Sequence, residues 1–143
     1  MKALVIYDSN LGNTKLIAEV IAGALGDTTR AIPVTDVNAD DLAGVELLVV
    51  GSPIIGWKPT VRMQQFLAGL RPGQLNGIKA TTFDTRVKLF IHGDAAKEMA
   101  KRLTELGAEI VAEPMPFYVL GKEGPLFEGE VEKAKVWAKK LLG

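Results

Sequence analysis

Short apolar runs alternate with longer amphipathic segments along this chain, and that alternation constrains the fold more than any other feature. The apolar runs have the length of strands and comprise Ala3–Tyr7, Thr29–Val34, Glu46–Gly51, Ile78–Phe83 and a fifth run, Glu109–Val111 with Met115–Leu120, interrupted by prolines. Between and after them, apolar residues recur at helical spacing in segments 16–25, 61–70, 95–106 and 130–142. Strands that alternate with helices predict an α/β fold, with a parallel sheet covered by helices on both faces.

No linker, repeat or low-complexity tract divides the 143 residues, so we expect one domain, 1–143. Right-handed crossovers leave few topologies, and for five parallel strands we expect the order 2-1-3-4-5. The winding then reverses between strands one and three, and ligands bind beyond the carboxyl ends of the strands at such a point. Pro33 suggests that strand two lies at an edge. Helix N-caps are predicted at Asn38, Thr60 and Asp94.

The composition excludes several classes of function. The chain has no cysteine, which excludes disulfides, thiolate metal sites and cysteine catalysis, and its single histidine makes a histidine-based metal site improbable, so no metal site is assigned. Seventeen acidic residues balance 17 basic ones, so nothing suggests nucleic acid or a membrane surface as a partner. No signal peptide or membrane-length apolar run is visible, and we expect a cytoplasmic monomer. No catalytic residue is assigned, and His92 is expected to be structural or exposed.

The segment Ser9–Thr14 follows the first apolar run and opens the first helix. Backbone N–H groups without internal partners and the helix dipole favour negative charge there, so the pattern predicts a phosphate site. Gly12 allows close approach of the backbone, and side-chain donors come from Ser9, Asn10, Asn13 and Thr14. Because the loop itself has no lysine or arginine, it is suited to a monophosphate held by neutral donors. The alternative is that Asn13 or Thr14 merely caps the helix.

The connector 52–59 follows the third strand and is unusually apolar for a loop, since it contains Ile54, Ile55 and Trp57. Bulky apolar residues in a surface connector need a partner, and a flat aromatic ligand would supply one. Pro53 stiffens the start of the connector, and Gly56 leaves one peptide free to change orientation. The alternative is that the three large side chains fold back on the core.

With these two loops in view, the chain resembles a flavodoxin, specifically a short member of that family, over essentially its whole length. The family's phosphate loop is Thr/Ser-x-Thr-Gly-x-Thr, and here it is Ser9-Asn10-Leu11-Gly12-Asn13-Thr14, in which Leu11 removes one hydroxyl. Segment 49–53 is similar to the strand and loop that reach the flavin ring, segment 80–86 to the third flavin loop, and segment 121–126 to the approach to the last helix.

The resemblance implies noncovalent FMN. Its phosphate would be held by the side chains of Ser9, Asn10, Asn13 and Thr14 and by the backbone N–H groups of Leu11 and Gly12. The ring would lie along Pro53, Ile54, Ile55, Gly56 and Trp57 and border Asp84, Thr85 and Arg86 at its other edge. Either Ile55 or Trp57 is the stacking residue, and the tyrosine that many members place on the outer ring face has no counterpart between Phe83 and Val87. The resemblance also implies that a peptide carbonyl near Gly56 rotates to accept a hydrogen bond from flavin N5.

Three cations, Lys58, Arg62 and Arg86, lie in or beside these loops, and the chain is neutral where flavodoxins are commonly acidic. Positive charge near the ring favours the fully reduced, anionic flavin, so we expect a less negative potential for the second one-electron reduction than is typical of the family. The alternative is that the three cations are solvated and point away.

The leading functional hypothesis is an electron carrier that passes single electrons between redox partner proteins. One alternative is an NAD(P)H-dependent quinone or flavin reductase on the same fold, although the short connectors argue against it. The other is a flavin-free interaction protein of the same architecture, which the substitution at Leu11 and the short third loop leave open.

Overall fold

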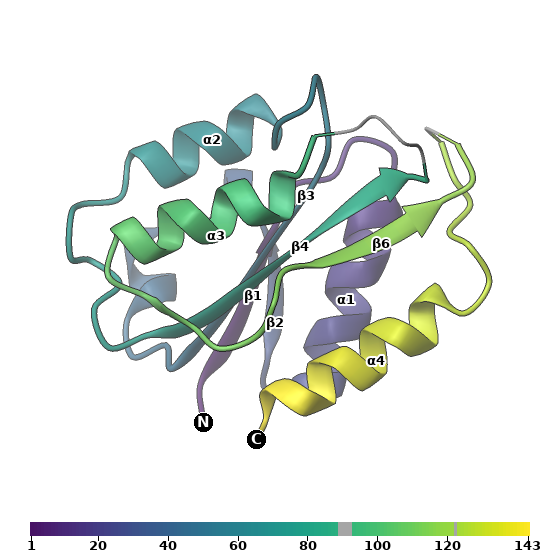
Figure 1. Ribbon diagram of the computed structural model, residues 1–143. Helices are drawn as coiled ribbons and strands as arrows, with labels where there is room; N and C mark the ends of the chain where they lie inside the picture. The colour runs from purple at the N-terminus through teal and green to yellow at the C-terminus, as the bar shows by residue number, and fades with distance from the viewer. Residues whose placement is uncertain (89–92, 122) are drawn as a thin grey trace.

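The computed structural model describes residues 1–88, 93–121 and 123–143 (Figure 1). Residues 87–91 also have the pattern of an extended run, which the sequence does not place in the sheet; part of that run and the whole of His92 lie outside the described residues. The strands are β1 Ala3–Tyr7, β2 Arg30–Pro33, β3 Leu47–Pro53, β4 Lys79–Val87, β5 Glu109–Ile110 and β6 Met115–Val119. The helices are α1 Asn13–Leu25, α2 Val61–Ala68, α3 Ala95–Glu105 and α4 Glu130–Leu141, with short 3₁₀ turns η1 Val34–Asp36 and η2 Ala39–Leu42.

The strands form one parallel sheet in the order β2-β1-β3-β4-β5, which confirms the predicted topology. The fifth position is divided, because β5 pairs with the start of β4 and β6 pairs in parallel with its end. The division falls at Pro114, where the sequence predicts an interruption, since proline has no N–H for the ladder. The Thr81 hydroxyl bridges the gap by donating to the Ala112 carbonyl at 2.9 Å. Pro33 lies in β2 at an edge, as predicted.

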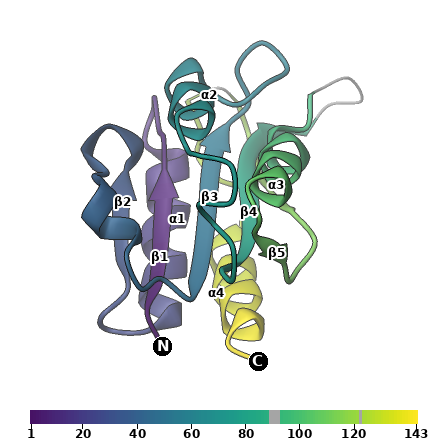
Figure 2. The same ribbon diagram turned by 90° about the vertical axis from the view of Figure 1, so that its left-hand side faces the viewer.

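Helices cover both faces of the sheet, with α1 and α4 on one side and α2 and α3 on the other (Figures 1 and 2). Alternate residues of the central strands feed two separate cores. On β3, Leu48 and Val50 pack with the α2–α3 side, whereas Leu47 and Val49 pack with the α1–α4 side. Both faces of β3 are therefore buried, which explains its nearly continuous apolar sequence.

Side-chain caps begin three of the short elements where the sequence predicts them. Thr60 accepts a hydrogen bond from the Met63 amide at 3.2 Å at the start of α2, and Asp94 accepts one from Lys97 at 3.0 Å at the start of α3. Asn38 forms a capping box with Asp41 before η2. These caps satisfy N–H groups that have no partner inside the helix.

The fourth strand is longer than the sequence suggests. The polar triplet Asp84-Thr85-Arg86 reads as a break after Phe83, but β4 continues through it to Val87 and pairs there with β6. The strand continues because every polar side chain in the triplet has a hydrogen-bond partner inside the protein. The prediction that the strand ends at Phe83 is therefore wrong, and the third loop begins later.

Candidate functional site

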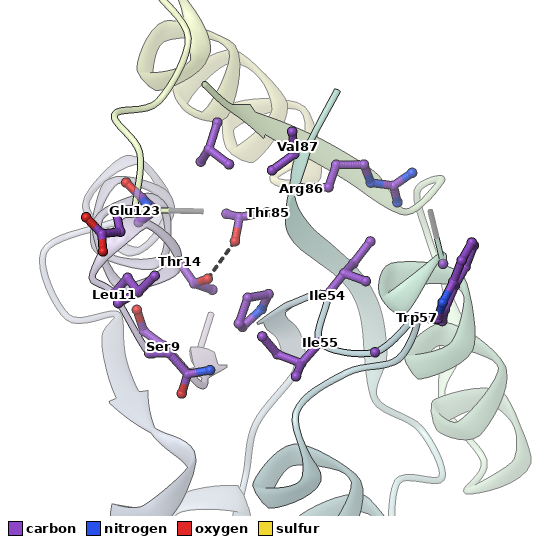
Figure 3. A pocket seen from close by; sticks show the side chains of 16 residues that line it. Ser9, Leu11, Thr14, Ile54, Ile55, Trp57, Thr85, Arg86, Val87 and Glu123 are labelled. Carbon is purple, nitrogen blue, oxygen red and sulfur yellow. Dashed lines mark hydrogen bonds between the residues drawn. The ribbon is translucent and has the colours of Figure 1, made fainter. Parts of the chain in front are cut away.

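A cavity of about 620 Å³ opens at the carboxyl ends of the strands, at the reversal of the winding between β1 and β3. Its volume lies within the range of small-molecule sites, about 300–1,000 Å³. Figure 3 shows one end of the cavity at the phosphate loop, where Leu11 lies beside the polar side chains of Ser9 and Thr14, and an apolar end at Ile54, Ile55 and Trp57. The lining residues are Ser9, Asn10, Leu11, Asn13, Thr14, Pro53, Ile54, Ile55, Gly56, Trp57, Thr85, Arg86, Val87, Gly93, Val119 and Glu123.

The polar end is built by the loop before α1. Gly12 is the N-cap with φ 97°, a left-handed conformation that glycine adopts without strain, and α1 has no side-chain cap among the described residues. Neither Asn13 nor Thr14 caps the helix, so that alternative reading is wrong. The Gly12 amide instead donates to Ser9 Oγ at 3.1 Å. The first turn of α1 therefore presents backbone N–H groups to the cavity, the arrangement that binds anions.

Thr14 joins this loop to the end of β4. Its buried hydroxyl lies 2.7 Å from the hydroxyl of Thr85 (Figure 3), so two residues predicted from separate segments are in direct contact. In such a pair one hydroxyl donates to the other, and the accepting hydroxyl keeps its own hydrogen for a further bond. The pair therefore has one O–H available where α1 meets β4.

The apolar end is built by a tight turn. Ile55 and Lys58 exchange backbone hydrogen bonds of 2.7 and 3.2 Å, and Gly56 and Trp57 between them have φ of 56° and 74°. Positive φ at both central residues is the mark of a two-residue type I′ turn, and it is uncommon for a bulky residue. Ile54 packs against the core, as the alternative reading expects, but Ile55 and Trp57 remain 47% and 56% exposed.

The end of β4 presents its residues to opposite sides, because successive strand residues alternate. Thr85 lies in the cavity, whereas Asp84 is fully buried on the α3 side and does not line it. Asp84 accepts hydrogen bonds from Arg86 at 2.8 and 2.6 Å and from the Ala96 amide at 2.9 Å. Burial raises the pKa of Asp84, and the hydrogen bonds from Arg86 and Ala96 oppose that rise. We correct the expectation for Asp84: it supports the wall of the site from behind.

Arg86 is also tied to Asp94, at 3.1 Å, and its side chain extends away from Thr14 in Figure 3. Asp94 caps α3, so Arg86 fixes the start of that helix against β4. Two carboxylates thus surround this guanidinium, and the cation predicted at the ring edge is neutralised by its neighbours.

Arg62 is neutralised in a similar way by Asp8, a residue the sequence did not single out. Nε and Nη2 of Arg62 lie 2.9 and 3.0 Å from the two carboxylate oxygens of Asp8, and the hydrogen bond raises the pKa of Arg62. The same Nη2 donates to Asn10 Oδ1 at 2.7 Å. Lys58 differs from both arginines, because it forms no ion pair within the described part of the chain.

All the predicted site residues line the cavity except Gly12 and Asp84. Sequence reasoning missed Val87, Gly93, Val119 and Glu123, which also line it. Val87 and Val119 end neighbouring parallel strands, so the carboxyl-end rule applied to the full length of β4 and β6 would have found them. Gly93 carries no such signal: a Cβ there would lie 1.8 Å from the Trp57 carbonyl oxygen, a contact only the fold reveals.

Within residues 1–88, 93–121 and 123–143, no group of three or more acidic or histidine side chains is placed to hold a metal ion. The same residues contain no helix long and apolar enough to cross a membrane.

The family model for the flavodoxin domain matches residues 4–107 of this chain. The chain belongs to the flavodoxin family. A curated flavodoxin from Aquifex aeolicus (strain VF5) is 35% identical over 92 residues, which are 59% of this chain and 49% of that protein. The match therefore spans about half the length of this curated relative.

Solved flavodoxin structures match the whole fold. Oxidised Flavodoxin 1 from Bacillus cereus matches with a TM-score of 0.83 at 22% identity, and the alignment covers 99% of this chain and 97% of that protein's chain. Two-electron reduced flavodoxin from Megasphaera elsdenii matches with a TM-score of 0.74 at 22% identity, and the alignment covers 96% of this chain and 98% of that protein's chain. At this level of identity the likeness establishes the flavodoxin-like architecture alone.

The flavin typical of this family fits the residues present. FMN has an anionic phosphate and a flat, largely apolar ring system, and the cavity has one end of each character. The uncapped N-terminus of α1 suits the phosphate, and the exposed Ile55 and Trp57 suit the ring. Leu11, which replaces a hydroxyl of the family pattern, still offers its backbone N–H.

Proposed function

We propose that this flavodoxin-family chain binds FMN and carries single electrons between redox partner proteins. The observation that supports the proposal most strongly is the shape of the cavity, in which the predicted phosphate loop and the predicted ring loop form opposite ends of one space. A monomeric state and a cytoplasmic setting remain part of this proposal.

In this proposal the protein binds and orients, and FMN when bound supplies the one-electron redox chemistry. Ser9, Asn13 and the first-turn amides of α1 hold the phosphate. The Thr14–Thr85 pair donates its remaining O–H to the part of the ligand between phosphate and ring. Ile55 and Trp57 flank the ring and exclude water from it, which strengthens every electrostatic interaction there.

In this proposal the Ile55–Lys58 turn would provide a hydrogen-bond acceptor for the N–H group that flavin N5 carries when it is reduced. The carbonyl groups of Ile55 and Lys58 already accept hydrogen bonds from the backbone N–H groups of Lys58 and Ile55, and the Trp57 carbonyl packs against Gly93. The Gly56 carbonyl accepts no hydrogen bond from the described residues. Because glycine tolerates both orientations of its peptide, Gly56 C=O is the group we assign to accept that hydrogen bond from N5–H.

Purification gives the most direct test. We expect recombinant protein to be yellow, with flavin absorbance bands, or to quench the fluorescence of added FMN with an equimolar endpoint. Protein that is colourless and leaves FMN fluorescence unchanged would contradict the proposal and favour the flavin-free alternative.

A reductase is the remaining alternative. The structural alignments with the two flavodoxins above cover 96–99% of this chain and 97–98% of theirs. The aligned length therefore leaves little room for the extra segments with which a reductase would enclose a substrate site. We therefore expect the FMN-loaded protein to show no steady-state oxidation of NAD(P)H with a quinone. It should instead accept electrons from dithionite and return them to a one-electron acceptor such as ferricyanide or a c-type cytochrome.

A further inference from the structure

Asp8, the last residue before the phosphate loop, is a buried carboxylate that accepts hydrogen bonds from that loop and from the start of α2. Its oxygens accept hydrogen bonds from the Ser9 amide at 3.0 Å, from Thr60 Oγ1 at 2.5 Å, and from Arg62 on both oxygens. Asp8 therefore connects the start of the phosphate loop to the start of α2, two segments that are about fifty residues apart in sequence.

The network continues in both directions from Asp8. Toward the phosphate loop, Arg62 donates to Asn10, and Ser9 Oγ accepts the Gly12 amide. Toward the connector 52–59, the Thr60 amide donates to Ser52 Oγ at 3.0 Å, and this hydrogen bond joins the start of the connector to the residue that follows its end.

We propose that Asp8 and Arg62 are positioning residues that hold the phosphate loop in its binding conformation, a proposal that rests on the proposed FMN function. The Arg62 guanidinium binds Asp8 with two of its nitrogens and Asn10 with one of them, so it fixes two positions at the start of the loop. Arg62 does not line the cavity, so in this proposal it acts through these two side chains.

This role depends on the planar fork of arginine. A guanidinium binds a carboxylate through two parallel N–H bonds, whereas an ammonium is a point charge that cannot reproduce that geometry. Arg62→Lys therefore separates the two explanations. If Arg62 merely supplied positive charge near an anion, lysine would preserve phosphate affinity; if it holds the loop, lysine fails nearly as much as glutamine does.

The first test compares FMN with riboflavin, which lacks the phosphate, by fluorescence titration of the apoprotein. We expect Arg62→Lys and Arg62→Gln each to weaken FMN binding about tenfold, equivalent to about 1.4 kcal/mol. Riboflavin affinity should stay close to that of the wild type. Arg30→Lys is the matched control, because Arg30 forms an ion pair with Asp41 far from the cavity, and it should change neither affinity.

Asp8→Asn completes a double-mutant cycle. Since Asp8 and Arg62 act as one unit, Asp8→Asn combined with Arg62→Gln should weaken FMN binding no more than either change alone. Equal losses for FMN and riboflavin, full retention by Arg62→Lys, or additive effects in the cycle would each overturn the inference.

A second test needs no flavin, so it separates this inference from the proposed function. In the apoprotein, Arg62→Lys should increase amide hydrogen exchange at Gly12, whose N–H donates to Ser9, and leave exchange in α4 unchanged. Unchanged exchange at Gly12 would refute the positioning role even if FMN binds. If the wild type fails to bind FMN while Gly12 responds, only the proposed function fails.

Discussion

Two aspartate–arginine pairs flank the cavity, and they differ mainly in exposure. In the pair at the end of β4, the side chains of Arg86 and Asp84 are 7% and 0% exposed. In the pair between the loops, the side chains of Arg62 and Asp8 are 49% and 7% exposed. The first pair is almost fully withdrawn from water, whereas the guanidinium of the second remains half exposed to solvent.

This difference separates support of the fold from support of the site. A buried pair is not strongly stabilising compared with apolar packing, but removal of one partner leaves a carboxyl with no compensating charge. A pair whose guanidinium is half exposed loses less when the arginine is removed, because water can take its place beside the carboxylate. Mutation of Arg86 should therefore act on global stability, whereas mutation of Arg62 should act on the local conformation of the loop.

Arg86→Leu should give the largest effect of any change around the cavity. We expect the apoprotein to lose about 3–5 kcal/mol of unfolding free energy, because Asp84 stays buried without its cation. Urea denaturation followed by circular dichroism measures this loss. The double variant Asp84→Leu with Arg86→Leu should recover part of it, and a single-variant loss as small as that of Arg30→Leu would break the comparison.

Lys58 tests what remains of the electrostatic hypothesis, since the two arginines near the cavity are each paired with carboxylates. Lys58 follows Trp57 in the turn and is exposed. In the FMN-loaded protein, Lys58→Glu should make the potential of the second one-electron reduction more negative by tens of millivolts, since a charge interaction of roughly 1 kcal/mol corresponds to that range.

Redox titration measures the potential, and Lys139→Glu, in the last turn of α4, is the control that should leave it unchanged. An unchanged or less negative potential for Lys58→Glu would contradict the hypothesis. Arg62→Gln should shift the potential less than Lys58→Glu does, because it changes the charge by one unit where Lys58→Glu changes it by two, and because Arg62 does not line the cavity.

The parts of the fold that depend on local pattern could be predicted from the sequence. Apolar runs that alternate with helical periodicity predicted a parallel sheet covered on both faces, and the rules for crossovers in such sheets supplied the strand order. Thr60 and Asp94 cap helices because hydroxyl and carboxylate side chains satisfy free N–H groups. Ser9–Thr14 and Ile54–Trp57 meet in one cavity because parallel strands end at one edge of a sheet.

The parts that depend on tertiary partners could not be predicted. Asp84 and Arg86 look like a polar break until Ala96 and Asp94 are known to lie beside them. Asp8 gives no local signal because its partners Thr60 and Arg62 are distant in sequence. In both cases a charged residue within or next to a strand is buried with a partner that only the fold supplies, and a single-sequence pattern assigns it to a loop or overlooks it.

The smallest expected effect concerns the pair Arg30–Asp41, whose arginine side chain is 67% exposed and whose aspartate side chain is 9% exposed, and which extends the comparison beyond the cavity. The Asn38 backbone N–H, and after it Arg30, lowers the pKa of Asp41. A carboxyl whose folded pKa is depressed stabilises the protein above its unfolded pKa of about 3.9, and that stability is lost as the pH falls through the folded value.

Asp41→Asn should therefore lower the melting temperature slightly at neutral pH. The difference from wild type should shrink as the pH falls below the unfolded pKa of about 3.9 and through the lower folded pKa of Asp41. Arg30→Gln should produce a still smaller change, because the backbone hydrogen bond from Asn38 is the larger cause of the shift and survives the substitution. Melting curves of the three proteins across the acid range measure both effects. If Arg30→Gln proved more harmful than Asp41→Asn, the ion pair rather than the cap would be the source of stability, and exposure would no longer rank the three pairs.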